Sequence, residues 1–252
     1  MLPGTLGRDL ARDLRATIAL KTREIWTPTK KQTRAIETTA DETFFGGQGG
    51  GGKTDLLGFI PLYYPGSRCI LYRRESGQHD DLIDRMRLVL EPAGGNIITS
   101  RRGGALAIYP NGSTLRFAHI AHDKHIGTWR GRAHELVLWD EVSEIAERHF
   151  RALKGWQRKA TTLSGKQTRL IAAGNPATQM ENGQIVGKWL IRYFAPWIQR
   201  GYRNPAKPGE LRWFVRDRDP VTGTEFDREI PGPTEGLERP PPFEVDLGKG
   251  PR

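Results

Sequence analysis

The sequence predicts an α/β fold with a mostly parallel central sheet, flanking helices and a small antiparallel extension. Apolar stretches at 43–47, 68–73, 136–139 and 169–173 have the composition of buried strands, and segments of helical periodicity lie between them. Strands that alternate with helices form parallel sheets, because each helix carries the chain back across one face. A chain of 252 residues is long enough to bury one sizeable core.

The helices between these strands follow from apolar spacing and from their stop signals. A helix is expected over 53–63, ending near Pro61, and another over 82–90, where apolar residues recur at helical spacing before Pro92. Two further helical patterns follow at 143–153 and 185–194.

Two antiparallel hairpins complete the predicted elements. Residues 105–109 and 113–118 flank the pair Asn111-Gly112, which is the strongest short hairpin signal, and they form the expected extension of the sheet. A second hairpin is expected where 211–217 and 224–230 are separated by a turn that contains Asp-Pro and Gly.

Composition limits the class of protein. The chain carries 39 Lys and Arg against 29 Asp and Glu, so its formal net charge is +10, which favours a polyanionic partner. The single cysteine, Cys69, excludes an internal disulfide framework and a thiolate zinc cage. No apolar run reaches the roughly 18 residues that span a bilayer, and charges interrupt the N-terminus where a signal peptide needs apolar residues. We expect a soluble cytoplasmic protein with no membrane partner.

Three regions are expected along the chain. Residues 1–26 form a basic helix, and within 1–34 eight Lys or Arg outnumber three Asp or Glu, which suits either a solvated face or a phosphate contact. Residues 27–230 form the globular domain. From 231 to 252, ten of 22 residues are Pro or Gly, too little apolar material to offset the entropy of ordering, so this region is a tail or an interdomain linker.

A glycine-rich loop fits the pattern G-x-x-x-x-G-K-T between the strand at 43–47 and the helix that begins at 53. Glycines let backbone N–H groups curl around phosphate oxygens, and the helix N-terminus adds partial positive charge. Lys53 would reach the β and γ phosphates and the Thr54 hydroxyl would bind Mg²⁺. A flexible glycine linker does not explain Lys-Thr at its end. The predicted phosphate-binding (Walker A) residues are Gly47, Gln48, Gly49, Gly50, Gly51, Gly52, Lys53 and Thr54.

An acidic pair follows the buried strand 136–139. Asp140 at the carboxyl end of that strand would face Mg²⁺ through its water shell, and Glu141 would polarise the water that attacks the phosphate. The alternative is an ordinary acidic helix N-terminus. With the glycine loop, this Walker B pair predicts a P-loop NTPase of the ASCE type that hydrolyses its nucleotide, with catalytic roles for Glu141 and Lys53.

Gln32 precedes the strand that leads into the loop. A Gln amide pairs bidentately with the adenine edge, so ATP is favoured over GTP, although the same residue is also compatible with a plain surface position.

Together these residues resemble the ATPase domain of the large terminase subunit, the DNA-packaging motor of tailed bacteriophages. The resemblance runs from about residue 27 to residue 198. It is carried by Gln32, the loop 47–54, the Arg-rich strand Leu71-Tyr72-Arg73-Arg74, the segment Gly127-Thr128-Trp129-Arg130-Gly131, the pair Asp140-Glu141, and Ala173-Gly174-Asn175-Pro176.

The resemblance implies roles for two further residues. Asn175 would be the polar sensor of γ-phosphate loss, within the family's coupling motif. Many relatives carry an Arg inside the loop, where this chain has Gln48 and Gly49, so the arginine finger must come from elsewhere. Arg130, supplied by a neighbouring subunit, is the first choice, with Arg73, Arg74 and Arg132 as alternatives.

The function implied is an ATP-hydrolysing motor that translocates double-stranded DNA into a viral procapsid in the host cytoplasm, gripping the DNA backbone independently of sequence. Its implied partners are the portal protein and the small terminase subunit. It would form a homo-oligomeric ring when assembled and be a monomer in isolation. The alternatives are a helicase-like or recombinase-like DNA ATPase and a nonhydrolysing, nucleotide-dependent assembly module.

Two sets of residues are not assigned chemistry. Relatives usually continue into an RNase H-like nuclease, whereas the acidic residues after residue 210 are crowded into a short region, so no nuclease domain is expected. His119, His122 and His125 are three apart, but they are expected at a strand end and in a solvated loop rather than in a zinc site.

Overall fold

The computed structural model describes residues 22, 24–47, 50–100, 104–157, 168–175, 180–181, 184–185, 187–223 and 225–232. The chain forms two compact units, Met1–Leu190 and Ile191–Arg252. This boundary falls inside the region 27–230 that the sequence assigns to one domain. Most of the predicted basic helix and of the predicted tail lie outside the described residues. No helix in the described ranges has the length and apolar character needed to cross a membrane.

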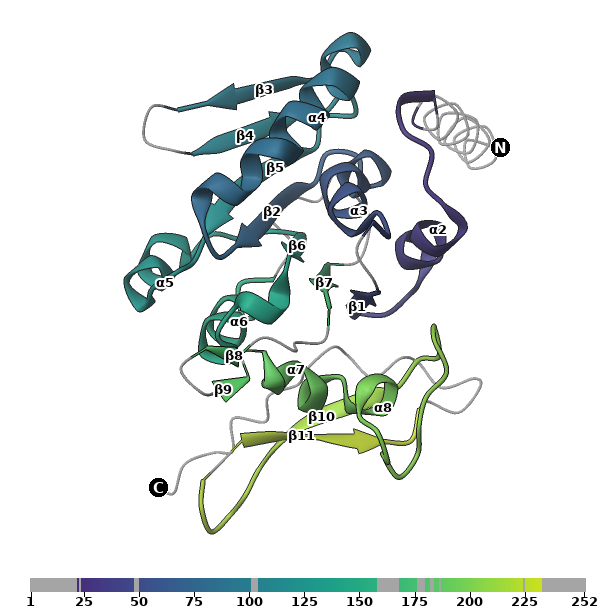
Figure 1. Cartoon of the computed structure of the whole chain (residues 1–252), viewed down its shortest axis with the longest axis vertical. Coiled ribbons are helices and arrows are strands. Elements are labelled where there is room, and N and C mark those ends of the chain that lie inside the picture. The colour runs from purple at the N-terminus through teal and green to yellow at the C-terminus, as the bar shows by residue number, and fades with distance from the viewer. Residues whose placement is uncertain are drawn as a thin grey trace, which may run out of the picture. The chain divides into compact units, whose positions relative to one another are not determined.

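The first unit is built on a seven-stranded sheet with the order β1-β7-β6-β2-β5-β4-β3 (Figure 1). Its strands β1, β7, β6, β2 and β5 are parallel, and β4 and β3 extend the sheet antiparallel to their neighbours. The predicted fold class, a mostly parallel sheet with an antiparallel extension, is confirmed. The strands are β1 Glu42–Gly46, β2 Arg68–Arg73, β3 Asn96–Thr99, β4 Ala105–Ile108, β5 Thr114–His119, β6 Leu136–Trp139 and β7 Arg169–Gly174.

Helices connect the strands of the first unit. The α-helices are α2 Lys30–Glu37, α3 Lys53–Phe59, α4 Asp80–Leu90, α5 Asp123–Trp129, α6 Glu147–Lys154 and α7 Lys188–Tyr193, the last of which crosses the unit boundary. Short 3₁₀ helices are η1 Ile60–Tyr63, η2 Ser76–His79, η3 Glu91–Ala93 and η4 Val142–Glu144, and β8 Met180–Glu181 pairs with β9 Gln184–Ile185. The second unit contains α8 Ala195–Ile198 and the predicted hairpin, β10 Trp213–Arg218 with β11 Glu225–Ile230.

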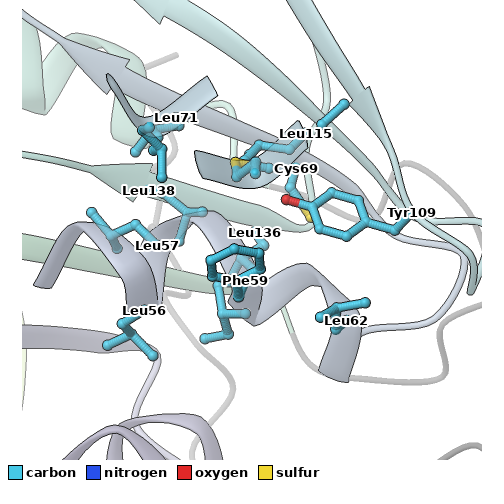
Figure 2. Packing of buried hydrophobic residues seen from close by; sticks show 14 of the residues in the cluster. Leu56, Leu57, Phe59, Leu62, Cys69, Leu71, Tyr109, Leu115, Leu136 and Leu138 are labelled. Atoms are coloured by element: carbon cyan, nitrogen blue, oxygen red, sulfur yellow. The ribbon is translucent and has the colours of Figure 1, made fainter. Parts of the chain in front are cut away.

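The main core lies between one face of the sheet and the helices α3 and α4. Figure 2 shows the part of this core in which residues of α3 pack against residues of the strands. Alternate residues of each strand point to this face, because successive side chains of a strand point to opposite sides. Cys69 of β2, predicted mid-strand, is one of them and is buried. On the other face, the Trp139 ring lies 5.1 Å from the Phe150 ring of α6. The residues labelled in Figure 2 are Leu56, Leu57, Phe59, Leu62, Cys69, Leu71, Tyr109, Leu115, Leu136 and Leu138.

Three local differences from the sequence prediction have physical causes. His119 ends β5 as predicted, but the expected loop is short, because helix α5 begins at Asp123 and includes His125; this helix buries none of its residues, so no apolar stripe in the sequence indicates it. Strand β3 was not predicted, because it is a short edge strand with one buried residue, Ile97. The helix predicted from residue 143 begins at Glu147, after η4.

Arg169, the first residue of β7, ties α2 to the sheet. Its side chain is buried and donates to the carbonyl oxygens of Ala35, Ile36 and Ala40, and also to two hydroxyls, of Tyr64 and Thr43. Ala35 and Ile36 lie in the last turn of α2, where carbonyls have no partner within the helix and a positive charge is stabilising.

We expect Arg169→Met to lower the free energy of unfolding by about 3–5 kcal/mol, because several buried acceptors lose their donor at once. Urea unfolding followed by circular dichroism measures this change. The control is Arg148→Met: Arg148 pairs with Asp123 across 2.7 Å, but both side chains are well exposed, so its loss is expected to change stability by less than about 1 kcal/mol. Similar losses for the two variants would contradict the anchoring role of Arg169.

Candidate functional site

The glycine loop lies where the sequence predicts it, between the end of β1 and the start of α3. Gly50 and Gly52 have φ of 76° and 69°, a left-handed conformation that L-residues with a side chain rarely adopt. Gly52 is the N-cap of α3, and no described side chain caps that helix. Gln48 and Gly49 lie outside the described residues. The loop therefore has the backbone that a phosphate cradle requires at its described positions.

Lys53, the first residue of α3, points its ammonium group back across the loop. The side chain is buried, and Nζ donates to the carbonyl oxygen of Gly47 at 3.0 Å and to Oδ1 of Asn175 at 3.3 Å. Asn175 directly follows β7, the strand that pairs with β1. The structure thus brings together the predicted phosphate lysine and the predicted γ-phosphate sensor, which are 122 residues apart in the chain.

Gln32 lies against the same loop from α2. Its Oε1 accepts from the Thr29 N–H at 2.7 Å, which completes a capping box at the start of α2, and its Nε2 donates to the Gly52 carbonyl at 2.8 Å. The residue is 3% exposed. Both ends of the amide are engaged, so reading an adenine edge would require it to exchange these two hydrogen bonds for new ones.

Thr54 and Asp140, the two predicted magnesium ligands, meet at the guanidinium group of Arg73. Nη2 of Arg73 forms a short ion pair with Oδ2 of Asp140 and lies 3.4 Å from Oγ1 of Thr54. Nε of Arg73 also donates to Oδ2 of Asp140, at 2.9 Å. Two hard oxygen donors that converge on one cationic group fit Mg²⁺, which prefers carboxylate and hydroxyl oxygens. The sequence ranked Arg73 among finger candidates and did not reveal this contact.

Glu141 turns sharply out of strand β6. Its φ of 45° makes it the one non-glycine residue of the described ranges with positive φ, a conformation that non-glycine residues adopt at an energetic cost and that occurs often at functional sites. Burial raises the pKa of its carboxyl group, and the negative charges of Asp140 and Glu144 add to this, whereas Lys53 and Arg73 oppose it. A carboxylate with a raised pKa is a better proton acceptor near neutral pH.

Gly174, the last residue of β7, lies directly against this turn. A Cβ at this position would be 3.2 Å from the backbone nitrogen of Val142 and 3.6 Å from the carbonyl carbon of Glu141. The absence of a side chain at Gly174 lets the end of β7 pack against the turn that carries Glu141.

We expect Gly174→Ala to lower ATP turnover by roughly tenfold, because moving the Glu141 turn by a few tenths of an ångström disturbs a positioned group. Steady-state ATP hydrolysis measures the effect, alongside thermal unfolding to confirm the fold. Gly155→Ala is the control, since a Cβ there would meet no atom within 4 Å and its φ is −60°. Equal turnover in the two variants would contradict a coupling between Gly174 and Glu141.

Arg130, the predicted finger, directly follows α5, on the connection that leads from β5 to β6. The side chain is exposed, and no described residue forms an ion pair with it. The alternative Arg132 lies 5.2 Å from the centre of the Trp129 ring, and Arg74 lies 3.9 Å from Glu75.

The three histidines gather around the start of α5. The rings of His119 and His122 lie 4.7 Å and 5.5 Å from that of His125. Burial and the two neighbouring rings lower the pKa of His125. Within the described ranges, no group of three or more His, Cys, Asp or Glu side chains is arranged to hold a metal ion.

Comparison with known proteins identifies solved structures with a similar fold. No protein-family model and no curated protein matches the chain. Among solved structures, a mutant of the large terminase ATPase domain of Thermus phage P74-26 has a TM-score of 0.50 at 15% identity, over 72% of this chain and 78% of that domain. The large terminase of a thermophilic bacteriophage has a TM-score of 0.47 at 16% identity, over 59% of this chain, and that of bacteriophage HK97 has 0.41 at 14%, over 56%. The chain covers 39% and 30% of those two terminases. Its fold is that of the large terminase ATPase domain.

Proposed function

We propose that the chain is an ATP-hydrolysing motor domain of a large terminase, which translocates double-stranded DNA into a viral procapsid. The observation that carries the proposal is the convergence of Lys53 and Thr54, at the start of the helix that follows β1, with Asp140 and Glu141, which follow β6, at the carboxyl edge of the parallel strands. Ligands of open α/β sheets bind at this edge. The fold shared with the P74-26 ATPase domain supports the same conclusion.

Each residue of the site then has a defined task. The loop Gly47 to Thr54 holds the phosphates with backbone N–H groups, and Lys53 neutralises the β and γ phosphates. Glu141 orients a water molecule and accepts its proton as the oxygen–phosphorus bond forms. The bond from the γ-phosphorus to the ADP oxygen breaks, which leaves ADP and inorganic phosphate. Mg²⁺ held by Thr54 and Asp140 would supply charge neutralisation to the phosphates.

Three residues act around this reaction. Arg130 of a neighbouring copy supplies positive charge to the transferred phosphoryl group, which makes the active site an interface of a ring. Asn175, whose amide already contacts Lys53, responds to the loss of the γ phosphate. Gln32 binds adenine once its amide leaves Thr29 and Gly52.

The net charge of +10 supports the DNA part of the proposal, because Lys and Arg contacts to phosphates do not depend on sequence. Portal protein and small terminase subunit would be the protein partners in the host cytoplasm during virus assembly. A helicase-like DNA ATPase would use the same ATP chemistry as the proposed motor, whereas a nonhydrolysing assembly module would have only nucleotide binding in common with it.

A triplex-displacement assay tests the proposal. We expect the protein, with ATP and Mg²⁺, to displace a third strand from a duplex while leaving the duplex intact, and to hydrolyse ATP faster in the presence of DNA. The control is Lys53→Ala, which is expected to lose both activities because nucleotide binding fails. Separation of the duplex strands would favour a helicase-like enzyme instead. Nucleotide binding without turnover, even with DNA and portal protein, would favour the assembly module.

A further inference from the structure

The contact between Arg73 and Asp140 follows from the register of the sheet. Tyr72 of β2 pairs with Trp139 of β6, so the next residues along the two parallel strands, Arg73 and Asp140, lie side by side. Both continue the alternate positions that face α3, on which Thr54 lies. The topology therefore delivers one guanidinium group to both predicted ligands of the cation.

Burial makes this contact electrostatically strong. Asp140 is 0% exposed and the Arg73 side chain is 14% exposed. A carboxylate removed from water needs a cation beside it, because an unpaired buried charge is strongly destabilising. Oδ1 of Asp140 accepts from the Glu141 N–H at 3.1 Å, and among the described residues Oδ2 accepts only from Arg73. Arg73 thus provides the positive charge that Oδ2 requires.

A divalent cation would need the same space. Mg²⁺ demands near-octahedral geometry, with oxygens about 2.1 Å away and several retained waters. A guanidinium nitrogen on Asp140 Oδ2 and 3.4 Å from Thr54 Oγ1 lies between the two oxygens, where the cation or one of its waters would have to be. Two cationic groups in so confined a site also repel each other strongly.

We propose that Arg73 is a built-in substitute for the divalent cation: its guanidinium neutralises Asp140 until Mg²⁺ enters with a nucleotide, and the two occupy the site alternately. This inference rests on the proposed function, because it takes Thr54 and Asp140 as the cation ligands. A purely structural ion pair would have a similar geometry, but it would not compete with a cation.

The affinity of the site for a divalent cation distinguishes a substitute for the cation from a purely structural ion pair. We expect Arg73→Gln to bind Mn²⁺ alone, measured by electron paramagnetic resonance of the full chain, at least about tenfold more tightly than the wild type, because the apparent affinity falls with the fraction of molecules in which the site is accessible. The control is Arg85→Gln. Arg85 pairs with Asp55 of α3 across 2.8 Å, next to Thr54, but 62% of its side chain is exposed, so unchanged Mn²⁺ affinity is expected.

Mn²⁺ binding also distinguishes a failure of the substitute role of Arg73 from a failure of the proposed function. Equal Mn²⁺ affinity in the wild type and Arg73→Gln, with normal binding of Mn²⁺ together with ADP, would overturn the substitute role and leave the proposed function standing. Absence of Mn²⁺ binding to the wild type even in the presence of ADP would overturn both.

A measurement on the wild type covers the case in which Arg73→Gln does not fold. Nitrogen-15 NMR of arginine side chains follows the Nε–H of Arg73, assigned through Arg73→Lys, which keeps a positive charge on β2. We expect saturating Mg²⁺ and ADP to move this signal from its hydrogen-bonded position to that of a solvated arginine. An unchanged position of the signal would show that Arg73 stays paired with Asp140 when the cation binds, and would overturn the inference.

Discussion

Replacing Glu141 by glutamine is expected to lower ATP turnover by roughly 10²- to 10⁴-fold, because the amide cannot accept the proton of the attacking water. ATP binding should persist, since the loop residues and Lys53 are unchanged. Single-turnover hydrolysis and titration with a fluorescent ATP analogue measure the two quantities separately. Glu91→Gln is the matched control, because Glu91 is exposed in η3. Turnover retained in Glu141→Gln would remove Glu141 from the reaction.

The same substitution should act on stability in the opposite direction. The raised pKa of Glu141 means that the folded protein holds this proton more tightly than the unfolded chain does. The resulting stability is present at low pH and is lost as the pH rises through the folded-state pKa, so the charged group is destabilising at neutral pH. Glu141→Gln is therefore expected to unfold at a slightly higher temperature than the wild type at pH 7. Turnover of the wild type should fall as the pH drops through the same pKa, which a pH–rate profile measures.

Replacing Arg130 by alanine is expected to lower turnover of the assembled protein about 10³-fold or more, the usual contribution of an arginine finger. Because the finger is proposed to come from a neighbouring copy, dilute wild-type protein should already hydrolyse ATP slowly, and turnover per subunit should rise with protein concentration or added DNA. Lys124→Ala, on the exposed surface of α5, is the control. Turnover strictly proportional to protein concentration and indifferent to DNA would point to a finger within one chain.

Mixing the two inactive variants tests the interface directly. Arg130→Ala retains Glu141, and Glu141→Gln retains Arg130, so a mixed ring contains sites that combine both functional groups. We expect the mixture to regain part of the wild-type turnover, whereas neither variant does so alone. A mixture as inactive as its components would contradict a finger supplied by a neighbouring copy.

The parts of the fold that the sequence predicted best have strong local signals. Strand 68–73 and strand 136–139 have the predicted limits, because each is an apolar run with polar residues at both ends. The hairpin of β4 and β5 forms at Asn111-Gly112, where the Asn111 amide also donates to the carbonyl oxygens of Pro61 and Leu62. Periodicity and turn chemistry act over a few residues, so a single sequence displays them.

What the sequence could not provide is the order of the strands. Arg73 was visible as one basic residue in an arginine-rich strand, and nothing local indicated that β2 lies beside β6. The same holds for Arg169, whose partners lie more than 100 residues away in the chain. The left-handed turn at Glu141 was equally hidden, because tertiary packing against Gly174 holds it and glycine is the residue that normally signals such a turn.

Strand β7 lies between β1 and β6, so it determines the distance between the strand that leads into the glycine loop and the strand that leads into the acidic pair. Had the loop-bearing strand and the acid-bearing strand been direct neighbours, their backbones would be about 5 Å apart; with one strand inserted, the gap is roughly 10 Å. In the proposed reaction, the terminal phosphate and the water that attacks it would lie in this gap. The inserted strand is thus a spacer, and backbone hydrogen bonds on both of its edges, rather than side chains, maintain the distance between β1 and β6.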